Sequence, residues 1–160
     1  MFVLQSLTIA PAVLPPLLAL AGAMDLVSRS IPNRLILLIL VSFGVYVAGA
    51  PLAEILAHAA CAFLVLIGGF ALFAKSLIGA GDAKLLSAVA LWFGFDHLVP
   101  LLAATALAGG VLALAYVTGH LVRVQLGITS KPARTIPYGA AIAFGALAVY
   151  PGWLSLVSAA

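Results

Sequence analysis

Six apolar stretches, separated by short polar or turn-forming segments, run along the 160 residues of the chain. A transmembrane helix needs about 20 mostly apolar residues to cross about 30 Å of hydrocarbon, and each stretch meets or nearly meets that length. Pro32 and Pro137 stand where two of the helices would begin, because a first helical turn tolerates the missing amide hydrogen. The pattern predicts six membrane-spanning helices, at residues 4–26, 32–49, 53–74, 82–95, 98–118 and 137–157.

The composition fits a protein built for lipid and excludes an ordinary soluble domain. Hydrophobic residues make up 66% of the chain and charged residues only 7%, whereas soluble domains carry about 25% charged residues. No internal repeat or low-complexity tail is visible, so residues 1–160 are interpreted as a single domain. The first 24 residues lack the basic flank of a secretory signal and contain Pro15 and Pro16, which favours a retained membrane helix.

The basic side chains all fall in connections on one side of the predicted membrane. The connections on the other side contain Glu54, and then Asp96 with His97, but no Lys or Arg. The positive-inside rule therefore predicts that both chain ends lie outside and that three connections are cytosolic. So few and such scattered basic residues do not form a nucleic-acid-binding stripe, and no nucleic-acid partner is expected. The basic residues are Arg29, Arg34, Lys75, Lys84, Arg123, Lys131 and Arg134.

Two of the four acidic residues lie at the cytosolic edges of different predicted helices. Asp25 ends the first helix and Asp82 begins the fourth, so the two could meet, whereas Glu54 and Asp96 lie on the outer side. The fourth apolar stretch would rise only about 21 Å, which is less than the hydrocarbon thickness. The Gly-Ala-Gly turn at residues 79–81 would then lie at membrane depth, against protein or a water-filled cavity, with Asp82 recessed beside it.

Two carboxylates in a poorly solvated site supply an acid and a base together. Because both cannot ionise cheaply, one keeps a proton while the other stays charged and takes a proton from water. That water attacks a peptide carbonyl, and the protonated partner donates to the developing oxyanion. This chemistry needs no metal and no cofactor, and His58, His97 and His120 lie on different segments, which argues against a metal site.

Other interpretations of these acids remain open at this point. Asp82 could cap its helix, and Asp25 could pair with Arg29 if the first helix continues that far. Intramembrane carboxylates also relay protons, so a small proton-coupled transporter is the alternative function, and a non-catalytic scaffold is a third. A transporter needs ionisable groups near the bilayer midplane with access from both faces. The position of both acids on the cytosolic side favours a peptidase.

Three sequence motifs around these acids resemble those of the prepilin peptidases, also called type IV leader peptidases. Residues 79–84, Gly-Ala-Gly-Asp-Ala-Lys, resemble the G-x-G-D-x-K signature, whose aspartate is catalytic in that family. Asp25, followed by an arginine and by Ile-Pro-Asn at 31–33, resembles the motif of the first catalytic aspartate. Ile-Pro-Tyr-Gly at 136–139 is similar to the family's entry into its last helix. The resemblance implies catalytic roles for Asp25 and Asp82, supported by Arg29, Pro32, Asn33, Gly79, Gly81, Lys84, Pro137, Tyr138 and Gly139.

The resemblance also implies an all-α, G-x-G-D intramembrane aspartic protease fold and a multi-pass place in the bacterial inner membrane. Its substrates would be prepilins or pseudopilins in the bilayer, which lose a short basic leader on the cytosolic side. Longer family members also methylate the new N-terminus and carry an N-terminal region with paired cysteines, whereas Cys61 is the only cysteine here. We therefore expect the short form typical of tight-adherence (Flp) pili, without N-methylation. The number of copies in an assembly stays open.

The supporting residues have more than one expected role. Lys84 lies about 200° round the helix from the preceding aspartate, so it is expected to reach the membrane interface, lipid or substrate instead of that carboxylate. Arg29 is expected either to tune Asp25 or to anchor the helix end. Asn33 is expected either to cap its helix, which is the favoured role, or to form a hydrogen bond near the two acids. Tyr138 is expected either to line the site or to lie at the interface because of its amphipathic ring.

Overall fold

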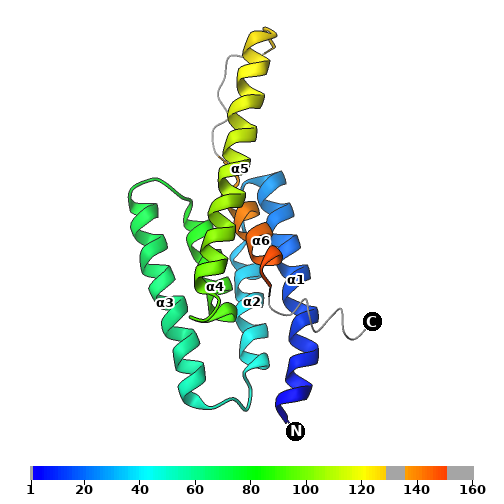
Figure 1. The fold of residues 1–160 in the computed structure, drawn as a ribbon, viewed down its shortest axis with the longest axis vertical. Coiled ribbons are helices and arrows are strands. Elements are labelled where there is room, and N and C mark those ends of the chain that lie inside the picture. The colour runs from blue at the N-terminus through cyan, green and yellow to red at the C-terminus, as the bar shows by residue number, and fades with distance from the viewer. Residues whose placement is uncertain (1, 129–135, 151–160) are drawn as a thin grey trace.

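The described part of the chain is entirely helical (Figure 1). A computed structural model describes residues 2–128 and 136–150, and it describes side chains from residue 13 onward. These residues form six helices and no strand. The helices are α1 (Phe2–Ser28), α2 (Asn33–Tyr46), α3 (Leu52–Ala74), α4 (Ala80–Phe93), α5 (Leu98–Gln125) and α6 (Tyr138–Ala148).

Each of the six predicted helices is present, and the ends differ for local reasons. Helix α5 continues to Gln125, beyond the predicted end at residue 118, because the sequence between residue 118 and Gly127 contains no proline and no pair of glycines. Gly127 then takes a left-handed conformation, with a φ of +68°, and the chain turns. Gly94, with a φ of +61°, ends α4 two residues early in the same way. Residues 129–135 of the predicted cytosolic loop and 151–157 of the predicted last helix lie outside the described part.

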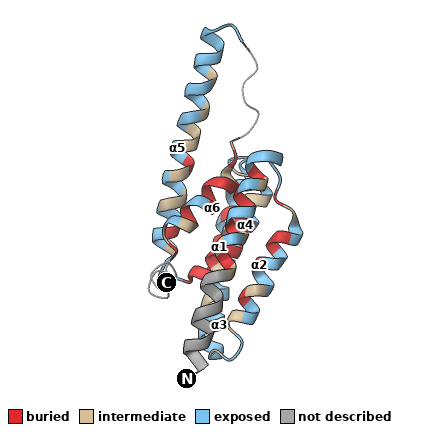
Figure 2. Ribbon diagram, turned by 90° about the vertical axis from the view of Figure 1, so that its right-hand side faces the viewer, coloured by how far each residue is buried: buried red, intermediate tan, exposed pale blue. Residues whose placement is uncertain are grey.

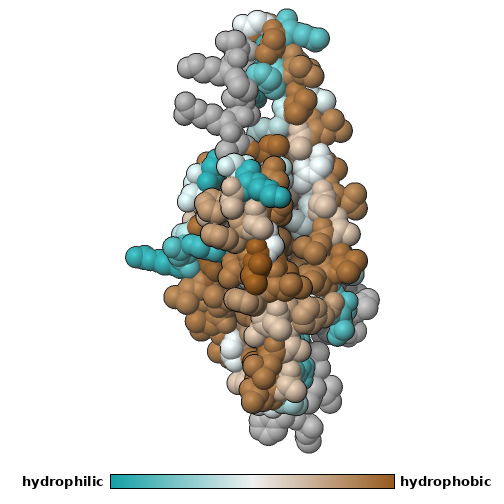
Figure 3. Space-filling view, turned by 90° about the vertical axis from the view of Figure 1, so that its left-hand side faces the viewer, coloured by the Kyte–Doolittle hydropathy of each residue, from teal (hydrophilic) through white to brown (hydrophobic). Residues whose placement is uncertain are grey.

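Among the residues whose side chains the structure describes, two helices are long and apolar enough to cross a membrane by themselves, α3 and α5. Their mean hydropathies are 2.3 and 2.2, and most of their residues face away from the rest of the molecule. Figure 2 shows α5 mostly exposed, with a few intermediate segments, whereas many of the buried residues gather in α4, α6 and the adjoining part of α1. Figure 3 shows hydrophobic side chains over much of the face on which α3 lies. Such extended exposed apolar surface is typical of a protein embedded in lipid.

Close packing in the bundle depends on small residues. Helix α3 packs mainly on α4, while α6 lies between α1 and α5 (Figure 1). A Cβ atom at Gly69 would lie 3.0 Å from the Cβ atom of Ala83, so α3 and α4 touch backbone to backbone. A Cβ atom at Gly145 of α6 would lie 2.6 Å from the amide nitrogen of Thr105 in α5. Small residues at such crossings let membrane helices approach closely.

The register between α3 and α4 sets the depth of the start of α4. Gly69 lies beside Ala83, five residues before α3 ends at Ala74. At about 1.5 Å per residue, Ala83 is therefore about 8 Å from the level of that end of α3, and the start of α4, three residues earlier at Ala80, is about 3 Å from it. At its other end, Gly94 lies against His58, so α4 also stops short of the start of α3. The short α4 thus falls short of its longer neighbour at both ends, and the recess of Asp82 below the membrane surface stays a prediction.

The basic residues collect at one end of the bundle. The α1–α2 and α3–α4 connections lie at the end towards which α5 projects, and α6 begins there too (Figure 1). The α2–α3 and α4–α5 connections face the opposite way (Figure 1). Lys131 and Arg134 lie outside the described residues, so five of the predicted basic positions can be placed. All five belong to the first end: Arg29, Arg34, Lys75, Lys84 and Arg123.

Candidate active site

Asp25 is a buried carboxylate at the end of α1. It lies in the last turn of the helix and its side chain is only 5% exposed. Its Oδ2 atom accepts a hydrogen bond of 3.0 Å from the backbone amide of Ala140, in the first turn of α6. The amides at a helix start carry a partial positive charge, which favours a carboxylate at that place. The start of α6 therefore stabilises a carboxylate that would otherwise be costly to bury.

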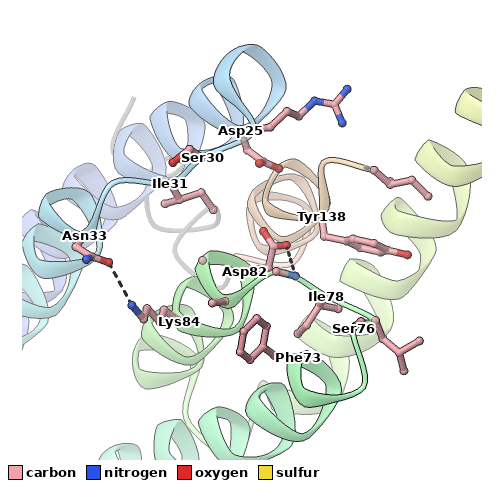
Figure 4. A pocket seen from close by; sticks show the side chains of 16 residues that line it. Asp25, Ser30, Ile31, Asn33, Phe73, Ser76, Ile78, Asp82, Lys84 and Tyr138 are labelled. Carbon is pink, nitrogen blue, oxygen red and sulfur yellow. Dashed lines mark hydrogen bonds between the residues drawn. The ribbon is translucent and has the colours of Figure 1, made fainter. Parts of the chain in front are cut away.

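Asp82 lies in the first turn of α4, facing the same space as Asp25. Its Oδ2 atom accepts a hydrogen bond of 3.1 Å from the backbone amide of Gly79, so it caps the helix start. The amide of Gly139 also interacts with this carboxylate. The capping role considered from the sequence is therefore present, and it leaves the partly buried side chain directed into the space shared with Asp25 (Figure 4).

The two carboxylates meet around Gly139, at the start of α6. A Cβ atom at Gly139 would lie 2.9 Å from the Oδ2 atom of Asp25 and 2.5 Å from the Cδ1 atom of Ile31. The backbone amide of Gly139 interacts with the carboxylate of Asp82 as a hydrogen-bond donor. The negative charges of Asp25 and Asp82 repel each other. Figure 4 shows the two acidic side chains pointing towards one another from α1 and α4. Residues 57 positions apart in the sequence thus converge on one backbone segment of α6.

Both carboxylates line one cavity of about 800 Å³. Six of the nine predicted supporting residues line it as well, namely Arg29, Asn33, Gly79, Gly81, Lys84 and Tyr138. The other three shape the backbone around it. Pro32 and Pro137 immediately precede α2 and α6, and Gly139 provides the close approach to Asp25. The remaining lining residues are Ser30, Ile31, Phe73, Ser76, Leu77, Ile78, Ala80 and Ile136.

A comparison with protein families covers the part of the chain that holds both acids. The family model of the type IV leader peptidases matches residues 12–114, which is more than half of the chain and includes both acids and the Gly-Ala-Gly-Asp segment. The chain belongs to the type IV leader peptidase family. No curated protein and no solved structure matches the chain. Family membership supports a peptidase function, and together with the two long apolar helices it indicates a membrane protein.

Lys84 of the leader peptidase turns away from the carboxylates. Its Nζ atom donates a hydrogen bond of 3.4 Å to the Oδ1 atom of Asn33, across the mouth between α4 and α2 (Figure 4). This agrees with the prediction that Lys84 does not share the direction of Asp82. The expected capping role of Asn33 is wrong, because Pro32 holds the N-cap position of α2 and makes no side-chain cap. Asn33 is the first residue of α2, and the oxygen of its side-chain amide accepts the hydrogen bond from Lys84 instead.

Arg29 connects the end of α1 to α5 beside the cavity. Helix α1 ends at Ser28, and Arg29 takes a left-handed conformation with a φ of +54°. Its guanidinium lies 5.1 Å from the ring centre of Tyr116 and donates a hydrogen bond to the hydroxyl oxygen of Tyr116. This cation–π contact supports the anchoring role expected for Arg29. The partner, Tyr116, was not among the predicted site residues.

Several positions around the cavity leave no signal in the sequence. Ala140 contributes through its backbone amide, so its side chain carries no sign of the contact with Asp25. Phe73 and Ile78 line the cavity because of where α3 ends and the α3–α4 connection turns (Figure 4). Ser76, with a φ of +57°, forms that turn and lines the cavity as well. These positions could be found only by knowing how α1, α3, α4 and α6 pack around the cavity.

The arrangement provides the groups that two-carboxylate hydrolysis requires. Two acids face one cavity, and backbone amides from residues 79, 139 and 140 approach them. Two carboxylates that come close together in a poorly solvated place favour sharing one proton, which leaves one base and one acid. The base can activate a water molecule and the acid can protonate the group that leaves.

Proposed function

We propose that this leader peptidase is an intramembrane aspartic endopeptidase that removes the short basic leader from prepilins or pseudopilins, with Asp25 and Asp82 as its catalytic dyad. The observation that carries the proposal is the convergence of these two side chains on the cavity at the start of α6. The end of the bundle where the basic residues collect would face the cytosol. The reaction would then occur at the cytosolic side of the bacterial inner membrane.

In the proposed reaction, a water molecule lies between the dyad and the scissile peptide bond. The ionised carboxylate takes a proton from this water, whose oxygen attacks the peptide carbonyl, while the protonated carboxyl donates its proton to the carbonyl oxygen. The resulting tetrahedral intermediate breaks at the carbon–nitrogen bond. The nitrogen takes up a proton, and the products are the leader, with a new carboxyl group, and the pilin, with a new amino terminus. Proton transfers return the dyad to its starting state.

Coexpression with a Flp-type prepilin tests the proposed reaction. We expect the wild-type chain to convert the precursor to a shorter product, seen as a shift on gel electrophoresis and as loss of the leader mass by mass spectrometry. The product should carry a free amino terminus without an added methyl group. A precursor that stays at full length beside a folded, membrane-inserted peptidase would contradict the proposed substrate class.

Six membrane crossings, with both chain ends outside, form a second part of the proposal. A reporter fused after Gly127 is expected to be cytosolic, because Arg123 and the other basic residues of that end favour the cytosol. A matched reporter inserted after Gly49, in the α2–α3 connection, should be periplasmic. Paired alkaline phosphatase and green fluorescent protein fusions measure both positions. The same location for both reporters would overturn the six-span arrangement.

A further inference from the structure

Helix α3 carries a continuous row of exposed apolar side chains besides the face that it packs on α4. Its buried residues are Cys61, Val65 and Gly69, and among the described helices α3 packs extensively only on α4. The row is open to the surroundings, with its large side chains between 38% and 69% exposed. We call it the α3 row; it consists of Leu52, Leu56, Phe63, Leu66, Phe70 and Phe73.

The spacing of the α3 row is that of a helix surface made to pack along another helix. With the exposed Ala59 between Leu56 and Phe63, successive members are four and three residues apart in strict alternation from Leu52 to Phe73. This period of about 3.5 residues is the one that keeps two helices in contact over their whole length. At about 1.5 Å per residue the row is about 32 Å long, close to the thickness of the hydrocarbon layer. A single transmembrane helix would therefore match its length.

The α3 row leads directly into the cavity that holds the two acids. Its last member, Phe73, lines that cavity (Figure 4). The Phe70 ring lies 6.0 Å from the ring of Phe73, so the apolar surface continues without a polar break from the lipid-facing part of α3. Gly69, one residue before Phe70, lies beside Ala83, which is adjacent to Asp82. A helix packed along the row would bring its end near Phe73 to the depth of the dyad.

This continuity selects one occupant. A lipid chain fits any exposed apolar face and has no reason to follow a row that ends in a catalytic cavity. A second copy of the chain packed along α3 would place a bulky helix across the mouth at Phe73. A substrate that consists of a membrane helix with a cleavable leader at its cytosolic end needs both features, an apolar track through the bilayer and a cavity at its end.

We propose that the α3 row is the docking surface for the membrane-spanning helix of the substrate, which it guides to the dyad. This inference rests on the proposed function, since it assumes that the substrate is an apolar transmembrane helix with a leader. It adds that recognition occurs along the bilayer, through Leu56, Phe63 and Phe70, and not only at the scissile bond. The three phenylalanines supply large, rigid contact surface of the kind that dominates binding energies.

Photo-crosslinking tests the docking surface without relying on catalysis. A benzophenone amino acid replaces Phe63 or Phe70 in the Asp25→Asn variant, coexpressed with a Flp-type prepilin. Matched controls replace Leu64 or Ala71, which are exposed on another face of the same helix and lie three or four residues from no member of the row. We expect crosslinks to the prepilin from the α3 row and few or none from the controls. Crosslinks only to a second copy of the peptidase, or to lipid at all four positions, would overturn the inference.

Kinetics in proteoliposomes give an independent test. The double variant with Leu56→Ala and Phe63→Ala changes the row far from the cavity, so we expect KM for prepilin to rise about tenfold while kcat stays within about twofold. The matched double variant with Leu107→Ala and Leu114→Ala removes two side chains of α5 that are 73% and 65% exposed, and it should keep both constants. Equal KM values for both double variants would overturn the docking surface while leaving the peptidase function intact. A wild-type chain that cleaves no prepilin would instead refute the proposed function.

Discussion

Replacing either acid by its amide, as Asp25→Asn or Asp82→Asn, is expected to slow leader removal by between about 10²- and 10⁴-fold, the range of a lost general acid or base. The amide keeps the shape of the side chain and still offers an oxygen to the backbone amides of Ala140 and Gly79. The fold should therefore survive while the proton-transferring group is lost. Initial rates of prepilin cleavage measure the effect, and thermal unfolding in detergent checks the fold.

The other two carboxylates of the chain serve as matched controls for the dyad. Glu54 and Asp96 are exposed at the opposite end of the bundle. Glu54→Gln and Asp96→Asn remove the same negative charge from the chain and are expected to leave the cleavage rate within about twofold. Near wild-type cleavage by Asp25→Asn or by Asp82→Asn would exclude the two-carboxylate mechanism. If the wild-type chain cleaves no prepilin but carries a proton-coupled flux across the membrane, and Asp25→Asn and Asp82→Asn lose that flux, the transporter would be favoured instead.

Gly139→Ala is expected to lower kcat by about 10²-fold, because small displacements of a catalytic group have effects of that size. The added Cβ atom would lie 2.5 Å from the Cδ1 atom of Ile31 and 2.9 Å from the Oδ2 atom of Asp25, which is closer than atoms pack. Either the start of α6 or the Asp25 side chain must then move. Single-turnover cleavage rates measure the effect, since they separate the chemical step from product release.

Two companion variants show whether the Gly139 effect is local. Gly110→Ala adds the same methyl group to α5, where a Cβ atom would meet nothing within 4 Å, and it should keep the wild-type rate. Adding Ile31→Val to Gly139→Ala removes the nearest clashing atom and should restore part of the lost rate. If Gly139→Ala cleaves as fast as Gly110→Ala, the close approach of α6 to the dyad has no catalytic importance.

The helical architecture could be predicted from the sequence because apolar length and breaking residues determine it. Pro32 and Pro137 immediately precede α2 and α6 as expected, and Gly94 and Gly127 end helices through their left-handed conformations. The end of α5 was harder, because the fall in hydrophobicity near residue 118 marks the expected membrane boundary and not the end of the helix. A helix continues into water as long as its backbone hydrogen bonds are unbroken.

The two acidic residues of the candidate site could be predicted from the sequence, whereas most of the contacts around them could not. Asp25 and Asp82 were identified because charged residues in apolar segments are rare and because their motifs resemble a known family. Contacts that depend on three-dimensional packing could not be predicted, such as the Arg29 contact with Tyr116 in α5. The same holds for the partner of Asn33, because its distance from Lys84 depends on how α2 and α4 pack. Sequence spacing carries no information about such crossings.

The hydrogen bond from the Ala140 amide to Asp25 has a consequence for mutational surveys. The donor belongs to the main chain of a residue that is already alanine, so alanine scanning would record position 140 as unimportant. Only a change to the peptide link itself, such as an ester in place of the amide, would delete this donor and leave every side chain intact. If Asp25 is catalytic as proposed, a group that holds it in place would thus remain hidden from the usual search for essential residues.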